Sequence, residues 1–107
     1  MSLRAIRGAI QVPANTSVDI AAGVQELIGA ILEANQLTPQ DVISVFFTST
    51  VDLNAAFPAA ACRDMGFANV PLIGSVEVDV PGALDRTIRA MLHVETKATP
   101  EEISHIY

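Results

Sequence analysis

The chain has 107 residues, of which 50% are hydrophobic, and its 6 basic against 12 acidic side chains give a formal net charge of -6 at pH 7. This acidic balance argues against nucleic acid and against an anionic membrane surface, because both attract a net basic protein. The length predicts a single domain over residues 1–107 with an aliphatic core. A chain this small and apolar is expected to cover part of its surface by self-association.

The first half of the chain predicts a strand, a long helix and a second strand. Residues 3–12 alternate with a period of two, so Arg7 is expected to point away from the aliphatic face and toward a cleft. Residues 18–35 carry apolar side chains at helical spacing. Residues 38–41 predict a short capped turn, and residues 42–48, rich in β-branched and aromatic side chains, predict a buried strand.

A second helix and a third strand are predicted next. The helix spans residues 58–65, with Gly66 as a natural terminator. The strand spans residues 70–80 and contains a proline near its start and a glycine inside. These two residue types indicate a sheet edge, a bulge or the close approach of another backbone.

The next segment, residues 84–96, fits both a helical and a strand period. We favour a short helical turn over residues 82–85 and a strand over residues 87–95, in which Arg89 shares a face with Met91 and His93. A capped turn then begins at Thr99. The element order β-α-α-β-α-β-β-α predicts an α+β fold, one mixed sheet with its helices on one side.

The single cysteine, Cys62, has no partner for a disulfide and is expected to pack within a helix. His93 and His105 lack cysteine partners at ligand spacing, so no metal site is expected. No stretch approaches the roughly 18 apolar residues of a membrane span, and the start lacks the basic region of an export signal. A soluble cytoplasmic protein is therefore the expectation.

Four arginines lie within otherwise apolar segments: Arg4, Arg7, Arg63 and Arg89. Guanidinium groups usually face water, so this placement predicts a pocket for a small anion. The binding of a small anion depends on a few oriented guanidinium groups and not on the net charge of the protein. The alternative is that these arginines form structural ion pairs with some of the acids. Glu77 is by default an exposed residue on the polar face of a strand. Residue chemistry alone leads to a small anion-binding α/β domain.

Eight segments in order resemble the monofunctional AroH-class chorismate mutases, with nearly the family's spacing from the start to the last residue. The segments are Arg4-Ala-Ile-Arg-Gly-Ala, Thr38-Pro-Gln-Asp-Val, Phe57-Pro-Ala, Cys62-Arg63, Val70-Pro-Leu, Glu77-Val-Asp-Val, Ile88-Arg89 and His105-Ile-Tyr107. The resemblance implies a homotrimer whose sheets pack as a pseudo α/β-barrel, with active sites at the subunit boundaries. It also implies the conversion of chorismate to prephenate in phenylalanine and tyrosine biosynthesis, without cofactor, metal or covalent intermediate.

The resemblance assigns roles to several side chains. Arg89 is expected to donate to the ether oxygen of the substrate, where negative charge gathers in the transition state. Glu77 matches the acid that meets the substrate hydroxyl and the electron-poor ring. Arg7 and Tyr107 match the residues that hold substrate carboxylates. Further positions match the walls of the site: Phe57, Ala59 and Arg63 from a neighbouring subunit, and Leu72, Ile73 and Gly74 along a strand.

Three departures from the family pattern leave alternatives open. Ala60 stands where the family often has lysine, Ile73 and Gly74 replace a hydrogen-bonding side chain, and the sequence stops at Tyr107, where relatives continue into a tail. A catalytically silent trimer that binds a small carboxylate metabolite is the second hypothesis. The third is an imine hydrolase of the similarly folded Rid group, which also places an arginine at trimer clefts.

Overall fold

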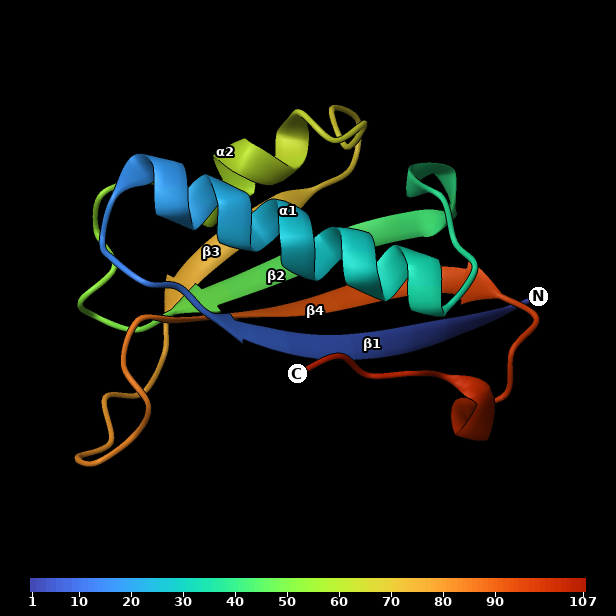
Figure 1. The fold of residues 1–107 in the computed structure, drawn as a ribbon. Helices are drawn as coiled ribbons and strands as arrows, with labels where there is room; N and C mark the ends of the chain where they lie inside the picture. The colour runs from blue at the N-terminus through green and yellow to red at the C-terminus, as the bar shows by residue number, and fades with distance from the viewer.

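The computed structural model describes residues 1–107 and folds them into a mixed four-stranded sheet with two helices on one face (Figure 1). This architecture confirms the predicted α+β class and the gathering of the helices on one side of the sheet. The elements in chain order are β1 (Ser2–Gln11), α1 (Ser17–Ala34), the 3-10 turn η1 (Pro39–Asp41), β2 (Val42–Ser49), α2 (Pro58–Arg63), β3 (Leu72–Val76), β4 (Thr87–Thr96) and the 3-10 turn η2 (Pro100–Glu102).

The sheet has the strand order β1-β4-β2-β3. The strand β4 pairs antiparallel with both β1 and β2, and β2 pairs parallel with β3. The outer strand β3 begins just after Pro71 and contains Gly74, so the prediction of an edge strand is confirmed. Proline is tolerated at such a position because it has no N–H to donate to a ladder.

The core lies between α1 and the helix-facing side of the sheet. Side chains at helical spacing along α1 are fully or nearly fully buried, and they meet the alternate side chains of β1 and β4. Burying each such aliphatic side chain contributes about 1.5–3 kcal/mol. The helix starts at the N-cap Thr16, whose hydroxyl oxygen accepts a hydrogen bond from the Asp19 N–H at 3.0 Å. The buried residues of α1 are Ile20, Gly23, Val24, Leu27, Ile28 and Ile31.

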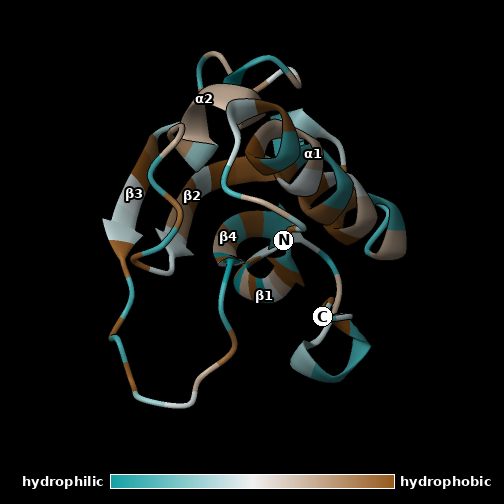
Figure 2. Cartoon of the chain, turned by 60° about the vertical axis from the view of Figure 1, so that its left-hand side comes forward, coloured by the Kyte–Doolittle hydropathy of each residue, from teal (hydrophilic) through white to brown (hydrophobic).

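Two sequence predictions about the segment between β3 and β4 are wrong. The strand β3 ends at Val76 and not near residue 80, because β2 ends at Ser49 and leaves the following residues without a neighbouring strand. Residues 82–85 form an irregular loop and no helical turn, and Gly82 has a φ of 84°. The segment instead projects from the sheet as a loop (Figure 2).

The helix α2 is also shorter than predicted and ends at Arg63 instead of residue 65. Gly66 follows it with a φ of 93°, which is the left-handed conformation expected of a glycine after a helix. No helix in the fold is both long enough and apolar enough to cross a membrane.

The sheet face opposite the helices is uncovered and partly apolar. The side chains of Leu3, Phe46, Ile73 and Met91 point to this face and remain 58%, 51%, 56% and 36% exposed. Apolar side chains gathered on one exposed face often mark a protein–protein contact. We call this surface the open face.

The thiol of Cys62 is fully buried, as expected for a helix-packing residue, and this burial raises its pKa to about 12. Because only the thiolate is nucleophilic, the native protein should react with an aromatic disulfide reagent at pH 8 at least about 100-fold more slowly than free cysteine. The release of the coloured thiol measures this rate. Unfolding in guanidinium should restore ordinary reactivity, and rapid labelling of the native protein would contradict the buried position.

Candidate active site

Strand pairing places Arg89 on the open face, on an inner strand of the sheet and near one end of it. Its β4 position lies between Ala9 of β1 and Thr48 of β2, and the next position along this face aligns Arg7 with Met91. Alternation in β4 puts Arg89, Met91 and His93 on the face opposite the buried residues, as predicted.

The guanidinium of Arg89 pairs with the carboxylate of Glu77. The Arg89 Nε lies 3.3 Å from Glu77 Oε1 and 3.4 Å from Oε2. Thr48 donates its hydroxyl to Glu77 Oε1 at 3.1 Å, and the Glu77 N–H donates to the Ser49 carbonyl at 3.0 Å. Because the bonds of Arg89 to Glu77 use only Nε, both terminal amino groups are left for a ligand.

Glu77 is therefore more than an exposed residue of a strand. Its side chain is only 18% exposed, whereas that of Arg89 is 51% exposed. The Glu77 carboxylate accepts a hydrogen bond from Thr48, and the Arg89 guanidinium paired with it stays open to solvent. This asymmetry orients a cation toward whatever occupies the adjacent cavity.

The C-terminal segment brings Tyr107 to the same place. Ile106 forms a parallel bridge to Gly8 of β1, with hydrogen bonds of 2.9 Å from the Ala9 N–H to the Ile106 carbonyl and 3.1 Å from the Ile106 N–H to the Arg7 carbonyl. A side chain at Gly8 would bring its Cβ within 2.8 Å of the Ile106 carbonyl oxygen, so only glycine fits there without displacement of the segment. The segment runs beside β1 in Figure 1.

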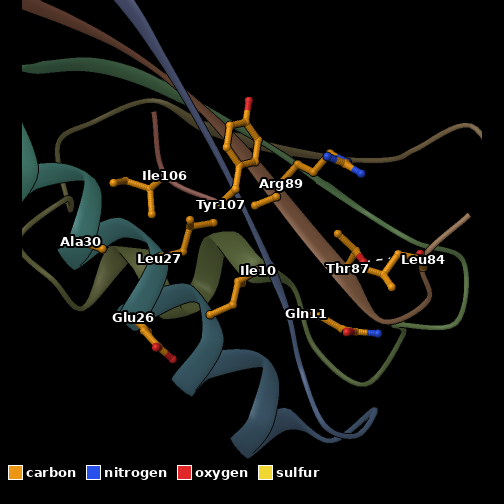
Figure 3. Close-up of a pocket in the computed structure, with 11 residues that line it drawn as sticks. Ile10, Gln11, Glu26, Leu27, Ala30, Leu84, Thr87, Arg89, Ile106 and Tyr107 are labelled. Atoms are coloured by element: carbon orange, nitrogen blue, oxygen red, sulfur yellow. Dashed lines mark hydrogen bonds between the residues drawn. The ribbon is translucent and has the colours of Figure 1, made fainter. Parts of the chain in front are cut away.

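Arg7, Arg89 and Tyr107 line a cavity of about 330 Å³, which we call the Arg7 cavity; Glu77 does not line it and contacts it only through Arg89 and Thr48. Its volume is that of a small-molecule site. Arg89 and Tyr107 also line one end of a second hollow of about 400 Å³, the β1-edge groove, whose other end lies against α1 (Figure 3). The residues lining the Arg7 cavity are Arg7, Gly8, Phe46, Thr48, Arg89, Ala90, Met91 and Tyr107.

The remaining predicted wall residues do not line the Arg7 cavity. Phe57, which is 80% exposed, and Gly74 line a separate hollow of about 440 Å³, the Phe57 cavity. Arg63 is exposed at the end of α2, and Ala59 is partly buried in the same helix. In one chain, Phe57 and Gly74 are thus separated from the residues that line the Arg7 cavity.

Two positions on β3 differ in what they face. Leu72 is partly buried against the core and lines none of the three cavities described. Ile73 pairs with Phe46 and lies on the open face.

The predicted anion pocket of four arginines is only partly right. Arg7 and Arg89 line one cavity, but Arg63 lies elsewhere and Arg4 donates from Nε to the Ala98 carbonyl at 3.2 Å. Arg4 therefore ties β1 to the turn after β4, which is a structural role. Thr48 was missed by the sequence analysis, because its carboxylate partner lies 29 residues away in the chain.

Fold and site together define a small α+β protein that presents two arginines and a tyrosine around one cavity, with a largely buried carboxylate, that of Glu77, paired to one of the arginines. Oriented guanidinium forks of this kind suit a carboxylate-bearing small molecule.

Comparison with known proteins gives the family. The sequence profile of the family described as chorismate mutase type I matches residues 3–107. The chain is 38% identical to chorismate mutase AroH of Bacillus subtilis (strain 168) over 108 aligned positions, which cover 100% of this chain and 85% of that protein. It is 41% identical to chorismate mutase AroH of Thermus thermophilus over 106 positions, 98% of this chain and 87% of that protein.

A solved structure agrees with the sequence relatives. The chorismate mutase from Clostridium thermocellum superposes with a TM-score of 0.95 at 46% identity, covering 97% of this chain and 93% of that one. The chain belongs to the type I chorismate mutase family. It is an isomerase, a chorismate mutase of aromatic amino acid biosynthesis, and the suspected resemblance is confirmed.

Replacing Thr48 by Val should lower kcat/KM for chorismate about tenfold, because Glu77 loses its donor and holds the Arg89 guanidinium less firmly. Steady-state loss of chorismate absorbance measures the effect. Ser44→Ala is the matched control, since Ser44 lies on the same strand but contacts His93 instead. Equal kcat/KM in Thr48→Val and the wild type would contradict the supporting role of the hydroxyl.

Proposed function

We propose that chorismate rearranges to prephenate in the Arg7 cavity, with Arg89 as the main electrostatic catalyst. The observation that carries this proposal is the Arg89–Glu77 pair at 3.3 Å, which leaves the terminal amino groups of Arg89 toward a cavity that Arg7 and Tyr107 also line. The reaction is a [3,3] rearrangement that breaks a C–O bond as a C–C bond forms, so it needs no proton carrier.

Arg89 suits the ether oxygen because the transition state gathers negative charge there. A cation that is already oriented binds this charge better than it binds the ground state, and the difference lowers the barrier. Glu77 supplies the orientation through Nε, and its second role is to meet the substrate hydroxyl and the ring fragment that becomes positive. Both roles use the carboxylate in its ionised form.

Arg7 and Tyr107 are proposed to hold the carboxylates of the substrate. Both residues are exposed and line the same cavity as Arg89. Chorismate is a dicarboxylate that must leave an extended form for a compact chair. Fixing its carboxylates at two points favours that chair, which reduces the entropy to be lost at the transition state.

The charges of one chain do not match this substrate. Arg7 and Arg89 with Glu77 give the cavity a net charge of +1, whereas the substrate carries two negative charges. We propose that Arg63 of a second copy supplies the missing cation, and that Phe57 and Ala59 of that copy form the opposite wall, while Ile73 and Gly74 line the strand side. The exposure of Phe57 and of the open face supports this arrangement.

The assembly we propose is a homotrimer with three such sites at its subunit boundaries, its open faces packed together as a pseudo α/β-barrel. In it the apolar open-face residues would leave water. No cofactor or metal is part of the proposal. A cytoplasmic location is also part of the proposal, on the sequence grounds given above.

Replacing Arg89 by Met should lower kcat at least about 100-fold, because a lost preorganised donor costs about 3 kcal/mol of transition-state stabilisation. Parallel assays of chorismate loss and prephenate formation measure the change. Lys97→Met, which removes an exposed cation beyond the end of β4, should keep wild-type turnover. Wild-type kcat in Arg89→Met would exclude Arg89 as the ether-oxygen donor.

Co-expressing Arg89→Met with Arg63→Ala should restore activity that neither variant has alone. If each site takes Arg89 from one copy and Arg63 from its neighbour, random mixing rebuilds about a quarter of the sites. Differently tagged variants allow the mixed trimers to be purified and assayed. Activity no higher than the average of the parents would argue against a shared site.

A further inference from the structure

We propose that Asn35 is a positioning residue for the mutase reaction, because its side-chain amide fixes the segment that carries Tyr107 to the site. This inference rests on the role proposed above for Tyr107. Asn35 is the residue that follows α1, and it belongs to none of the cavities described.

The Asn35 amide pairs with both backbone groups of a single residue near the C-terminus. Its Nδ2 donates to the Ser104 carbonyl at 2.9 Å, and its Oδ1 accepts from the Ser104 N–H at 2.8 Å. The two residues lie 69 positions apart in the sequence. A planar amide offers one acceptor and a donor side by side, so it can satisfy a backbone N–H and C=O together, as a neighbouring strand would.

Asn35 is also held by the last turn of α1, independently of its bonds to Ser104. The backbone N–H of Asn35 already bonds to the Ile31 carbonyl at 3.2 Å. The Nδ2 group also reaches the Ile31 carbonyl at 2.9 Å, so the helix fixes the direction of the amide. The amide is thereby oriented toward Ser104 before the segment docks.

From Ser104 the segment continues along the edge of β1 to Tyr107. The imidazole Nδ1 of His105 accepts from the Arg7 N–H at 3.0 Å, and Ile106 bridges to Gly8 as described. Ile106 is partly buried, but Ser104, His105 and Tyr107 are exposed. Ile103 and Ile106 pack against the core, and the hydrogen bonds at Asn35 and β1 fix the path of the exposed residues between and after them.

This arrangement couples the far end of α1 to the cavity. Loss of the Asn35 bonds frees the segment at Ser104, so Tyr107 samples other positions and binds a carboxylate less well. A residue that acts on ground-state binding changes KM more than kcat. The catalytic groups Arg89 and Glu77 lie on other elements and keep their geometry.

The composition of the chain supplies a direct probe of Tyr107. It is the only tyrosine, and the chain has no tryptophan, so tyrosine fluorescence reports on this residue alone. Asn35→Ala should lower its fluorescence anisotropy and raise KM for chorismate about tenfold, with kcat within about threefold of wild type. Glu33→Ala, an exposed position near the same helix end, is the control and should change neither quantity.

A double-mutant cycle separates positioning from general destabilisation. If Asn35 acts through Tyr107, adding Asn35→Ala to Tyr107→Ala should raise KM less than about twofold further. The proposal would be overturned if the increases in KM from Asn35→Ala and Tyr107→Ala were additive in the double mutant. It would also be overturned if Asn35→Ala kept the anisotropy and the KM of the wild type. If that variant does not fold, the nearly isosteric Asn35→Asp, which keeps the acceptor but loses the donor, is measured in its place and should give intermediate changes.

Failure of the inference differs from failure of the proposed function. A wild-type protein without mutase activity would refute the function, while the anisotropy comparison would still test the tether. An active wild type whose Asn35 variants leave Tyr107 and KM unchanged would refute the tether alone.

Discussion

The whole arrangement depends on the central position of β4, which is paired on both sides and covered by helices on only one face. Ile88, Ala90, Leu92 and Val94 enter the core, so the alternate residues must face the open side. A slip of one residue in the register would turn Arg89 into the apolar core. Core packing therefore fixes the face of the sheet on which Arg89, the cation that we propose for catalysis, lies.

The role that we propose for the Arg89–Glu77 pair is chemical more than stabilising. Half of the Arg89 side chain is exposed, and ion pairs near water typically contribute about 0–1 kcal/mol to stability. The pair orients the guanidinium of Arg89. The Glu77 carboxylate, held by Thr48, accepts from Arg89 Nε and leaves the two terminal amino groups free. Orientation of this kind costs nothing at the moment of reaction, because it is already present in the folded protein.

Local periodicity predicted most of the fold. The period of two in residues 3–12 and 87–95 and the helical spacing up to residue 35 matched the structure to within a residue or two. The extension of β3 toward residue 80 was wrong because alternation continues in the sequence after the partner strand has ended. Residues 82–85 are all exposed, so no core packing stabilises the expected helical turn there, and Gly82 adopts a positive φ.

The site was harder to predict than the fold because its contacts join distant parts of the chain. Family resemblance named Arg7, Glu77, Arg89 and Tyr107, and these side chains lie together. Nothing local marks Thr48 as a partner of Glu77. The same holds for Asn35 and Ser104, whose pairing exists only once α1 and the C-terminal segment have docked on β1.

The most direct test is a crystal structure of the protein bound to a bicyclic ether dicarboxylate that mimics the transition state. The account predicts a terminal nitrogen of Arg89 about 3 Å from the ether oxygen, with Arg63 of another copy near the bound molecule. An ether oxygen without a guanidinium beside it, or a ligand enclosed by one chain only, would contradict it.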